Sequence, residues 1–343
     1  MKLFHKTISA ITAVSLSLTA LLSGCSLFAP STAPAEPTAA TVSEATAAAA
    51  TAATVPTQAK NALSPLLWKV TGDNGNVLYL FGTIHLGDKR SETVMQQLAA
   101  TVDACDALAV ECDVLAFEQD QDRLTKVVQS MLYTDGTKTP DHLRADLYEK
   151  AKDYLTEENE YNDVYNYYNL SFWSSLLQQT ETDNSDLHHD YAMDTLLLRR
   201  AKDNKQEILE VESVEFQYNM DNSFPDALYN MQIEAFFDEL DTYISGLNRL
   251  YEAWLKGDEA EIIATMDSDE DSGDMTEEEI KLAEDYHKAL ITDRNIGMTE
   301  KAEAYLKNGK SVFFAVGAAH MVGDEGIVKQ LTDKGYRVER LSP

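Results

Sequence analysis

The chain has 343 residues, of which 58 are acidic and 28 are basic, so its formal net charge at pH 7 is −30. Apolar residues make up 44% of the chain, which is enough for a hydrophobic core and excludes disorder over the whole length. The charge excludes nucleic acid as a partner, because no basic run is present to contact phosphates. Three cysteines are too few for a disulfide scaffold.

The N-terminus has the pattern of a secretory leader that ends in a lipidation site. Two lysines precede an apolar and small-residue run, Thr7–Gly24, as in a signal peptide. The run ends in Leu22-Ser23-Gly24-Cys25, which resembles a bacterial lipobox. We therefore expect cleavage of residues 1–24 and acylation of Cys25, with membrane lipid holding the protein outside the cytoplasm. An uncleaved spanning helix is the alternative, since the run is about one membrane thickness long.

Residues 25–61 are dominated by Ala, Thr, Pro and Ser, which predicts a flexible tether. One folded domain, residues 62–343, is expected to follow it. Large helical insertions are expected at about 117–205 and 217–308, the second interrupted by an acidic loop at 267–274. Shorter helices are expected at 91–105 and 326–334. Apolar runs predict strands, and hence an α/β or α+β domain with one central sheet, at 68–70, 76–81, 107–110, 207–211, 312–316 and 336–341.

One motif occurs twice, after an apolar strand at each end of the domain: Gly82-Thr83-Ile84-His85 and Gly317-Ala318-Ala319-His320. Glycine at a strand end lets the chain turn sharply and lets another group approach closely. Ligands of open α/β sheets bind beyond the carboxyl ends of strands, so neighbouring loops of this kind would bring two imidazoles together. Imidazole is a common ligand of transition metals and titrates near neutral pH. A lone histidine of this kind is more often structural, but the repetition favours function.

Two other short apolar strands end in an acid, at Glu111 and Glu212. If all these strands run in the same direction, both acids reach the same edge of the sheet as the histidines. Two histidines, one carboxylate and an open position for water are the composition of a catalytic metal site. The alternative is that both glutamates are exposed charges. Arg294 is either a clamp for a carboxylate or oxyanion or one partner of a surface salt bridge.

The other histidines and the central tyrosines are expected to be structural or surface residues. The tyrosines of residues 161–168 are expected to pack a helical hairpin rather than to bind a peptide or sugar. Cys105 and Cys112 flank the strand before Glu111, and the sequence leaves open whether they form a disulfide or remain free. The histidines expected to be structural or solvent-facing are His142, His188, His189 and His287.

Taken in order, these residues resemble the TraB/GumN family, the bacterial relatives of the Tiki proteins. The resemblance extends from about Leu67 to the C-terminus and depends on an ordered series rather than on one motif. Besides the two Gly-x-x-His loops and Glu111, the series contains Ala192-Met193-Asp194, Glu210-Val211-Glu212-Ser213 with Gln217, Trp254-Leu255-Lys256-Gly257-Asp258 and Arg294-Asn295.

The resemblance implies a fold like that of the erythromycin-esterase and haem-binding ChaN group, in which a mixed sheet carries the Gly-x-x-His loops. For the Tiki branch it implies a metal-dependent protease that uses manganese or cobalt, with zinc as an alternative. Carried over by motif position, the metal or catalytic set is His85, Glu111 and His320, with Arg294 as electrophilic helper and Glu212 and Asp194 as further acids.

We therefore expect a hydrolase that acts on a peptide or small molecule by activating water at a metal, with Arg294 stabilising the oxyanion. A metal-free form would use one histidine as general base, with Glu111 setting its tautomer. A binding protein is the main alternative, because the TraB branch is associated with shutting down peptide-pheromone signalling. Capture of metal or haem, as in the ChaN relatives, is the third.

Overall fold

The computed structural model describes residues 63–73, 75–266 and 275–341. The expected leader, the tether and the acidic loop at 267–274 lie outside the described residues. Among the helices that are described, none combines the length and the apolar character needed to cross a membrane.

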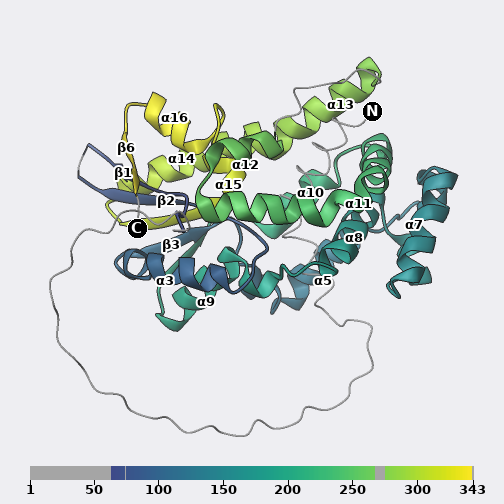
Figure 1. Cartoon of the computed structure of the whole chain (residues 1–343), viewed down its shortest axis with the longest axis horizontal. Helices are drawn as coiled ribbons and strands as arrows, with labels where there is room; N and C mark the ends of the chain where they lie inside the picture. The colour runs from purple at the N-terminus through teal and green to yellow at the C-terminus, as the bar shows by residue number, and fades with distance from the viewer. Residues whose placement is uncertain (1–62, 74, 267–274, 342–343) are drawn as a thin grey trace, which may run out of the picture.

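One mixed sheet of six strands has the order β4-β3-β5-β2-β1-β6 (Figure 1). The four strands from β4 to β2 run parallel to their neighbours, whereas β1 is antiparallel to both β2 and β6. The α/β expectation and its six strands are confirmed, including the placing of the last strand at an edge. The strands are β1 (Leu67–Thr71), β2 (Val77–Thr83), β3 (Ala107–Val110), β4 (Glu207–Glu210), β5 (Val312–Gly317) and β6 (Arg337–Leu341).

The central strands are apolar throughout because helices cover both faces of the sheet. Every residue of β3 and β5 is buried, as expected for parallel strands between two helical layers. Figure 1 places α3 and α9 on one side of the sheet and α14 and α16 on the other. These helices span α3 (Arg90–Asp103), α9 (Met193–Asp203), α14 (Asp293–Asn308) and α16 (Ile327–Asp333).

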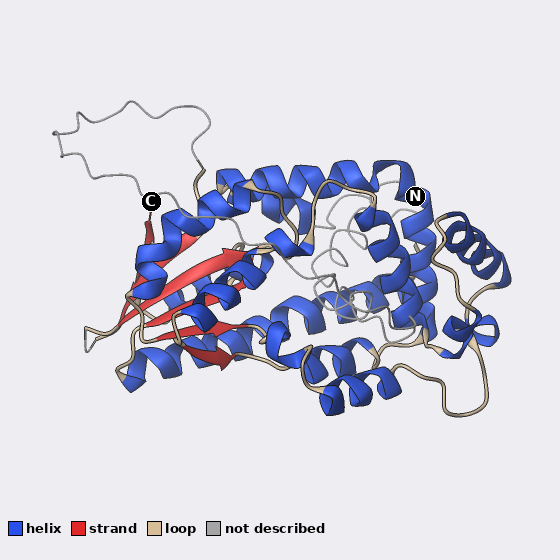
Figure 2. Cartoon of the chain, turned by 90° about the horizontal axis from the view of Figure 1, so that it is seen from below, coloured by secondary structure: helices blue, strands red, loops and turns tan. Residues whose placement is uncertain are grey.

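The remaining helices lie largely beyond the carboxyl ends of the parallel strands, as Figure 2 shows. They are separated by loops rather than continuous, so the two predicted helical blocks are correct in type but contain many breaks. They are α4 (Val114–Phe117), α5 (Gln121–Ser130), α6 (Thr139–His142), α7 (Ala145–Glu157), η1 (Asp163–Tyr167), α8 (Leu170–Asp183), η2 (His189–Tyr191), α10 (Val214–Asp221), α11 (Asp226–Lys256), α12 (Glu259–Met266), α13 (Glu277–His287), the π-helical turn η3 (Lys288–Thr292) and α15 (Ala318–Met321).

Aromatic side chains hold the α7–α8 hairpin together, which confirms the structural interpretation for Tyr161, Tyr165 and Tyr168 but not for Tyr167, which is exposed. The indole of Trp173 is fully buried and its N–H donates to the carbonyl of Tyr165 at 2.9 Å. Tyr148 and Tyr161 contact the same indole at ring-centroid distances of 5.7 and 6.5 Å. Such aromatic contacts add stability beyond the area they bury.

The long helix α11 connects this helical region to the sheet. Near its C-terminal end, Trp254 donates its indole N–H to the carbonyl of Gly82 at 2.8 Å. The hydroxyl of Tyr251 accepts a hydrogen bond from the backbone N–H of Asp88 at 3.1 Å. Both contacts fix the first Gly-x-x-His loop against α11, so this helix forms one wall beside the loop.

Candidate functional site

Both Gly-x-x-His loops leave the sheet at the same edge and side by side. Their strands β2 and β5 are adjacent and parallel, and Thr83 is in register with Gly317. On the other side of β5, strands β3 and β4 run in the same direction and lead into Glu111 and Glu212. Strands that are far apart in the sequence therefore bring all four side chains to one edge, where ligands of such sheets bind.

The side chains meet in the space that the missing side chain of Gly317 leaves open. A Cβ atom on Gly317 would lie 3.2 Å from Glu111 Oε1, 3.6 Å from His320 Cδ2 and 3.7 Å from His85 Nε2. Neither motif glycine has a positive φ, so a sharp turn is not the reason for glycine here. Close approach of other groups is the reason, and that half of the expectation is confirmed.

Alanine at the two motif glycines is expected to have different consequences. Gly317→Ala would put a methyl group among the three site side chains, in a backbone conformation (φ −48°) that alanine adopts freely. We expect it to lower any activity of this site by at least tenfold and to change the free energy of unfolding by less than about 1 kcal/mol. Gly82→Ala would meet the backbone Cα of Ala318 at 3.0 Å, so its main effect is expected on stability.

Urea unfolding and an activity assay on both variants separate the two effects. A loss of stability in Gly317→Ala as large as in Gly82→Ala would contradict the assignment of this open space to the candidate site.

Each histidine is held through Nδ1 and leaves Nε2 facing this space. His85 Nδ1 donates to Asp194 Oδ2 at 2.8 Å, and His320 Nδ1 donates to Asn295 Oδ1 at 2.7 Å. The amide of Asn295 donates to the carbonyl of Glu325 at 2.9 Å, which directs its oxygen toward His320. The expected tautomer-setting role of Glu111 is therefore wrong, because Asp194 and Asn295 occupy the positions that set the tautomers.

The two imidazoles differ in proton affinity. Burial lowers the pKa of His85, but the charge and hydrogen bond of Asp194, with a smaller contribution from Glu111, outweigh burial and raise it above 6.5. For His320, burial and then the positive charge of Arg294 lower the pKa to about 3. Nε2 of His320 is buried, lacks a hydrogen-bond partner and lies 4.0 Å from Glu111 Oε1. Asp194 therefore favours the protonated form of His85, whereas burial and Arg294 favour the neutral form of His320.

Asp194→Asn is expected to change the pKa of His85 from above the ordinary histidine value to below it. Without the carboxylate, burial dominates, so His85 should lose its proton below pH 6.5 rather than above it. Histidine side-chain NMR titrations measure this midpoint. Asp190→Asn is the matched control, since Asp190 pairs with Arg199 at the surface, and it should leave the midpoint unchanged. An unchanged midpoint in Asp194→Asn would contradict this account.

Arg294 is buried and joins the two glutamates. Its Nη2 donates to Glu111 Oε2 at 2.7 Å and to Glu212 Oε2 at 2.8 Å, while Nε donates to both oxygens of Glu212. Gln217 Nε2 donates to the same two carboxylates at 3.1 and 2.8 Å. Arg294 is 6% exposed and Glu111 is 8% exposed, so the alternatives of a surface salt bridge and exposed strand-end charges are wrong.

The ion pairs keep Glu111 charged. Burial raises the pKa of the Glu111 carboxyl, but Arg294, both imidazoles and the backbone N–H of Gly317 more than offset burial and lower it. That N–H donates to Glu111 Oε1 at 2.6 Å. Because Nε and Nη2 of Arg294 are committed to carboxylates and Nη1 donates to the carbonyl of Leu290, the geometry favours a positioning role over the expected oxyanion contact.

The two free Nε2 atoms are donors that a divalent metal ion would use, with their Nδ1 atoms held by outer partners as in many metal sites. The third expected ligand, Glu111, already accepts hydrogen bonds at both oxygens, from Gly317 and from Arg294. In the described part of the chain, no group of three His, Cys, Asp or Glu side chains is arranged to hold a metal ion. The side chains as placed do not fit a three-ligand site.

Three residues that support the site, Gln217, Asn295 and His189, were not among the predicted site residues. Gln217 and Asn295 were named only as parts of the family series. Asn295 is the residue after Arg294, and Gln217 lies in α10, five residues after Glu212. His189, expected to be structural, donates from Nδ1 to the backbone carbonyl of His85 at 3.0 Å. That contact holds the first loop in place.

The two cysteines of this region are free and buried. Cys105 precedes β3 and Cys112 follows it, so the strand separates them and no disulfide joins them. Burial, and then the negative charge of Glu111, raise the pKa of the Cys112 thiol, which makes it a poor nucleophile.

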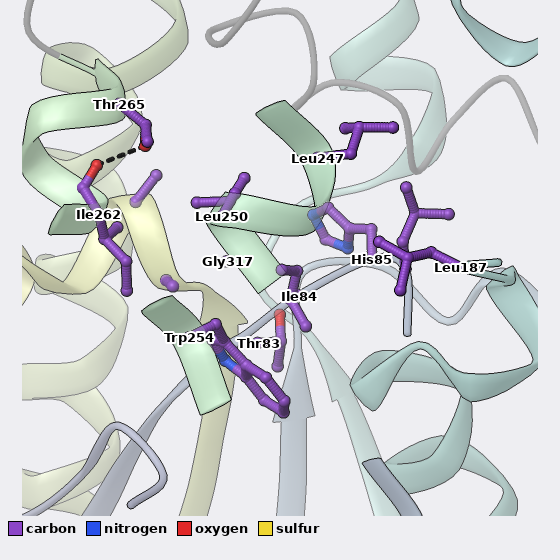
Figure 3. Close-up of a pocket in the computed structure, with 13 residues that line it drawn as sticks. Thr83, Ile84, His85, Leu187, Leu247, Leu250, Trp254, Ile262, Thr265 and Gly317 are labelled. Atoms are coloured by element: carbon purple, nitrogen blue, oxygen red, sulfur yellow. Dashed lines mark hydrogen bonds between the residues drawn. The ribbon is translucent and has the colours of Figure 1, made fainter. Parts of the chain in front are cut away.

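A pocket with mainly apolar walls opens beside His85, as Figure 3 shows. Leu247, Leu250 and Trp254 of α11 form one wall, and Leu187 lies close to the imidazole. Gly317 also borders the pocket, so the pocket and the histidine site are continuous.

The fold and the site together define a class of α/β protein in which adjacent parallel strands end in paired Gly-x-x-His loops beside an arginine-bound pair of glutamates. The chain belongs to the TraB/PrgY/gumN family, whose model matches residues 66–340. The expected family is thereby confirmed over nearly the whole described chain. A search of curated proteins gave no match.

Proposed function

We propose that this protein is a hydrolase of the peptidase type and that the paired histidines carry out the reaction. The observation that carries the proposal is the difference between the imidazoles: His85 is bound to Asp194, whereas Nε2 of His320 is buried and free. Both face the open space at Gly317. A proton acceptor and a proton donor that border one space are what acid–base hydrolysis requires.

In the proposed reaction, Nε2 of neutral His320 takes a proton from a water molecule as its oxygen attacks the substrate carbonyl carbon. Protonated His85 then gives its Nε2 proton to the leaving nitrogen as the carbon–nitrogen bond breaks. His320 then passes its proton to His85, directly or through solvent, which restores the starting state. Acid–base catalysis of this kind contributes roughly 10²–10⁴ in rate. Glu111, held anionic by Arg294, stabilises the positive charge that develops on His320.

The function is tested with quenched fluorescent peptides and the protein from about residue 60 onward. The proposal is supported if the unmodified protein hydrolyses the peptides and both His85→Ala and His320→Ala lower the rate. Hydrolysis that survives both changes overturns it. Peptide binding without turnover in the unmodified protein supports the second candidate, a peptide-binding protein, which the apolar pocket beside His85 favours.

A divalent metal is a separate proposal, supported by the family and by the two free imidazole nitrogens. Manganese, cobalt or zinc bound there would have to displace Arg294 or Gly317 from Glu111, or take another third ligand. Metal analysis of the purified protein, with hydrolysis measured before and after chelation, tests it. If chelation abolishes activity and manganese restores it, the reaction depends on metal and the residue-only reaction is wrong. Full activity in a metal-free sample would support the residue-only reaction.

We also propose that the protein works outside the cytoplasm as a lipoprotein, with acylated Cys25 in the membrane and residues 25–61 as its tether. The sequence Leu22-Ser23-Gly24-Cys25 after an apolar run supports this. Mass spectrometry of the mature N-terminus is the test. An N-terminus that begins before Cys25, or an unmodified thiol there, would overturn the anchor.

A further inference from the structure

Among the residues that the structure describes, His85 is the only ionisable one in the wall of the pocket beside the histidines. Its polar side chains besides His85 are Thr83 and Thr265, and the rest of its surface is aliphatic, aromatic or backbone. In Figure 3, Leu187, Leu247 and Leu250 lie around His85, and Ile262 and Trp254 lie farther from it on the side of Leu250. Burying a charged group against these apolar walls would cost several kcal/mol unless the group found a partner.

The pocket is placed where a substrate side chain next to the reacting bond would lie. His85 and Gly317 border both the pocket and the open space where the two histidines meet. A substrate carbonyl carbon at Gly317 would be within reach of both Nε2 atoms. The substrate side chain next to that carbonyl would then point toward the walls formed by α11 and α12. The net charge of −30 adds a long-range preference against acidic substrates.

We propose that this pocket is a subsite for a large apolar side chain, aliphatic or aromatic, adjacent to the bond that the enzyme cleaves. The inference rests on the proposed hydrolase function and names its substrate class. Burial of such a side chain against these walls gains about 25 cal/mol for each Å² of apolar surface removed from water. The pocket selects the residue, and the histidines carry out the reaction.

The experiment uses a set of quenched peptides that differ at one residue beside the cleaved bond: leucine, phenylalanine, alanine, aspartate or lysine. We expect leucine and phenylalanine peptides to be cleaved about 10–200 times better than the alanine peptide, and the aspartate peptide least. Leu250→Lys should reduce the leucine preference at least tenfold and improve cleavage of the aspartate peptide. Leu240→Glu is the matched control, since Leu240 is a half-buried leucine of α11 outside the pocket, and it should leave the preference unchanged.

Binding of the same peptides to the His320→Ala variant is measured by calorimetry in parallel, with and without Leu250→Lys. Cleavage without preference for apolar residues, unaffected by Leu250→Lys, overturns the subsite and leaves the hydrolase function standing. If no peptide is cleaved but apolar peptides bind selectively and Leu250→Lys weakens that binding, the hydrolase function is overturned. The pocket is then supported as a binding site for apolar side chains. Absence of both cleavage and selective binding overturns both proposals.

Discussion

Arg294→Met is expected to lower the free energy of unfolding by about 3–5 kcal/mol, the cost typical of breaking a buried ion pair by removing one partner. Arg294 is bound to Glu111 and Glu212, whose side chains are only 10% and 9% exposed. Without the guanidinium, both carboxylates either stay charged without a partner or take up protons. Urea unfolding followed by circular dichroism measures the loss.

A matched surface variant separates burial from the simple loss of an arginine. Arg144 also makes two hydrogen bonds to one glutamate, Glu234, but its side chain is 46% exposed. Arg144→Met should therefore cost less than about 1 kcal/mol. In addition, Glu111→Gln combined with Arg294→Met should cost less than the sum of the two single changes, because the residues interact directly. Equal losses in the buried and the surface variant would contradict the role given to Arg294.

His320→Gln is expected to reduce hydrolysis by about 10²–10⁴, because it removes the only proposed proton acceptor on that side of the reacting bond. The change should act on kcat more than on KM, since the substrate side chain binds in the pocket and not on His320. His142→Gln is the control: His142 lies outside the site, where its Nδ1 is 2.7 Å from Asp226. Measurement of kcat and KM for both variants on a leucine peptide is the test.

Stability must be measured on the same samples. Glutamine can still donate to Asn295, so we expect His320→Gln to fold with a free energy of unfolding within about 1–2 kcal/mol of the unmodified protein. A folded His320→Gln that retains full hydrolysis would show that His320 is not the base. Equal losses of activity in His320→Gln and His142→Gln would point to a general effect on folding instead.

The local patterns of the sequence predicted the strands and their shared edge well. Continuous apolar runs such as Val312–Val316 mark strands that are covered on both faces, and the two Gly-x-x-His motifs placed His85 and His320 at one edge of the sheet. These inferences need only a residue's neighbours in sequence and the rule that parallel strands end together.

The partners of the site residues were harder to predict because they come from the packing of helices far away in sequence. Asp194 reaches His85 across 109 positions, and Arg294 reaches Glu111 across 183. Whether Arg294 lay on the surface or inside depended on how α14 docks on the sheet, which no local pattern shows. For the same reason, the prediction that Glu111 sets the tautomer of a histidine was wrong, because Asp194 and Asn295 hold the Nδ1 atoms.

The strand order has a consequence for how the protein matures. β5, one of the last elements in the chain, lies in the middle of the sheet between β3 and β2. A chain still being synthesised has its first histidine loop but not its second, and its sheet remains split into two halves. The candidate site therefore cannot form until β5 and the loop after it have been made.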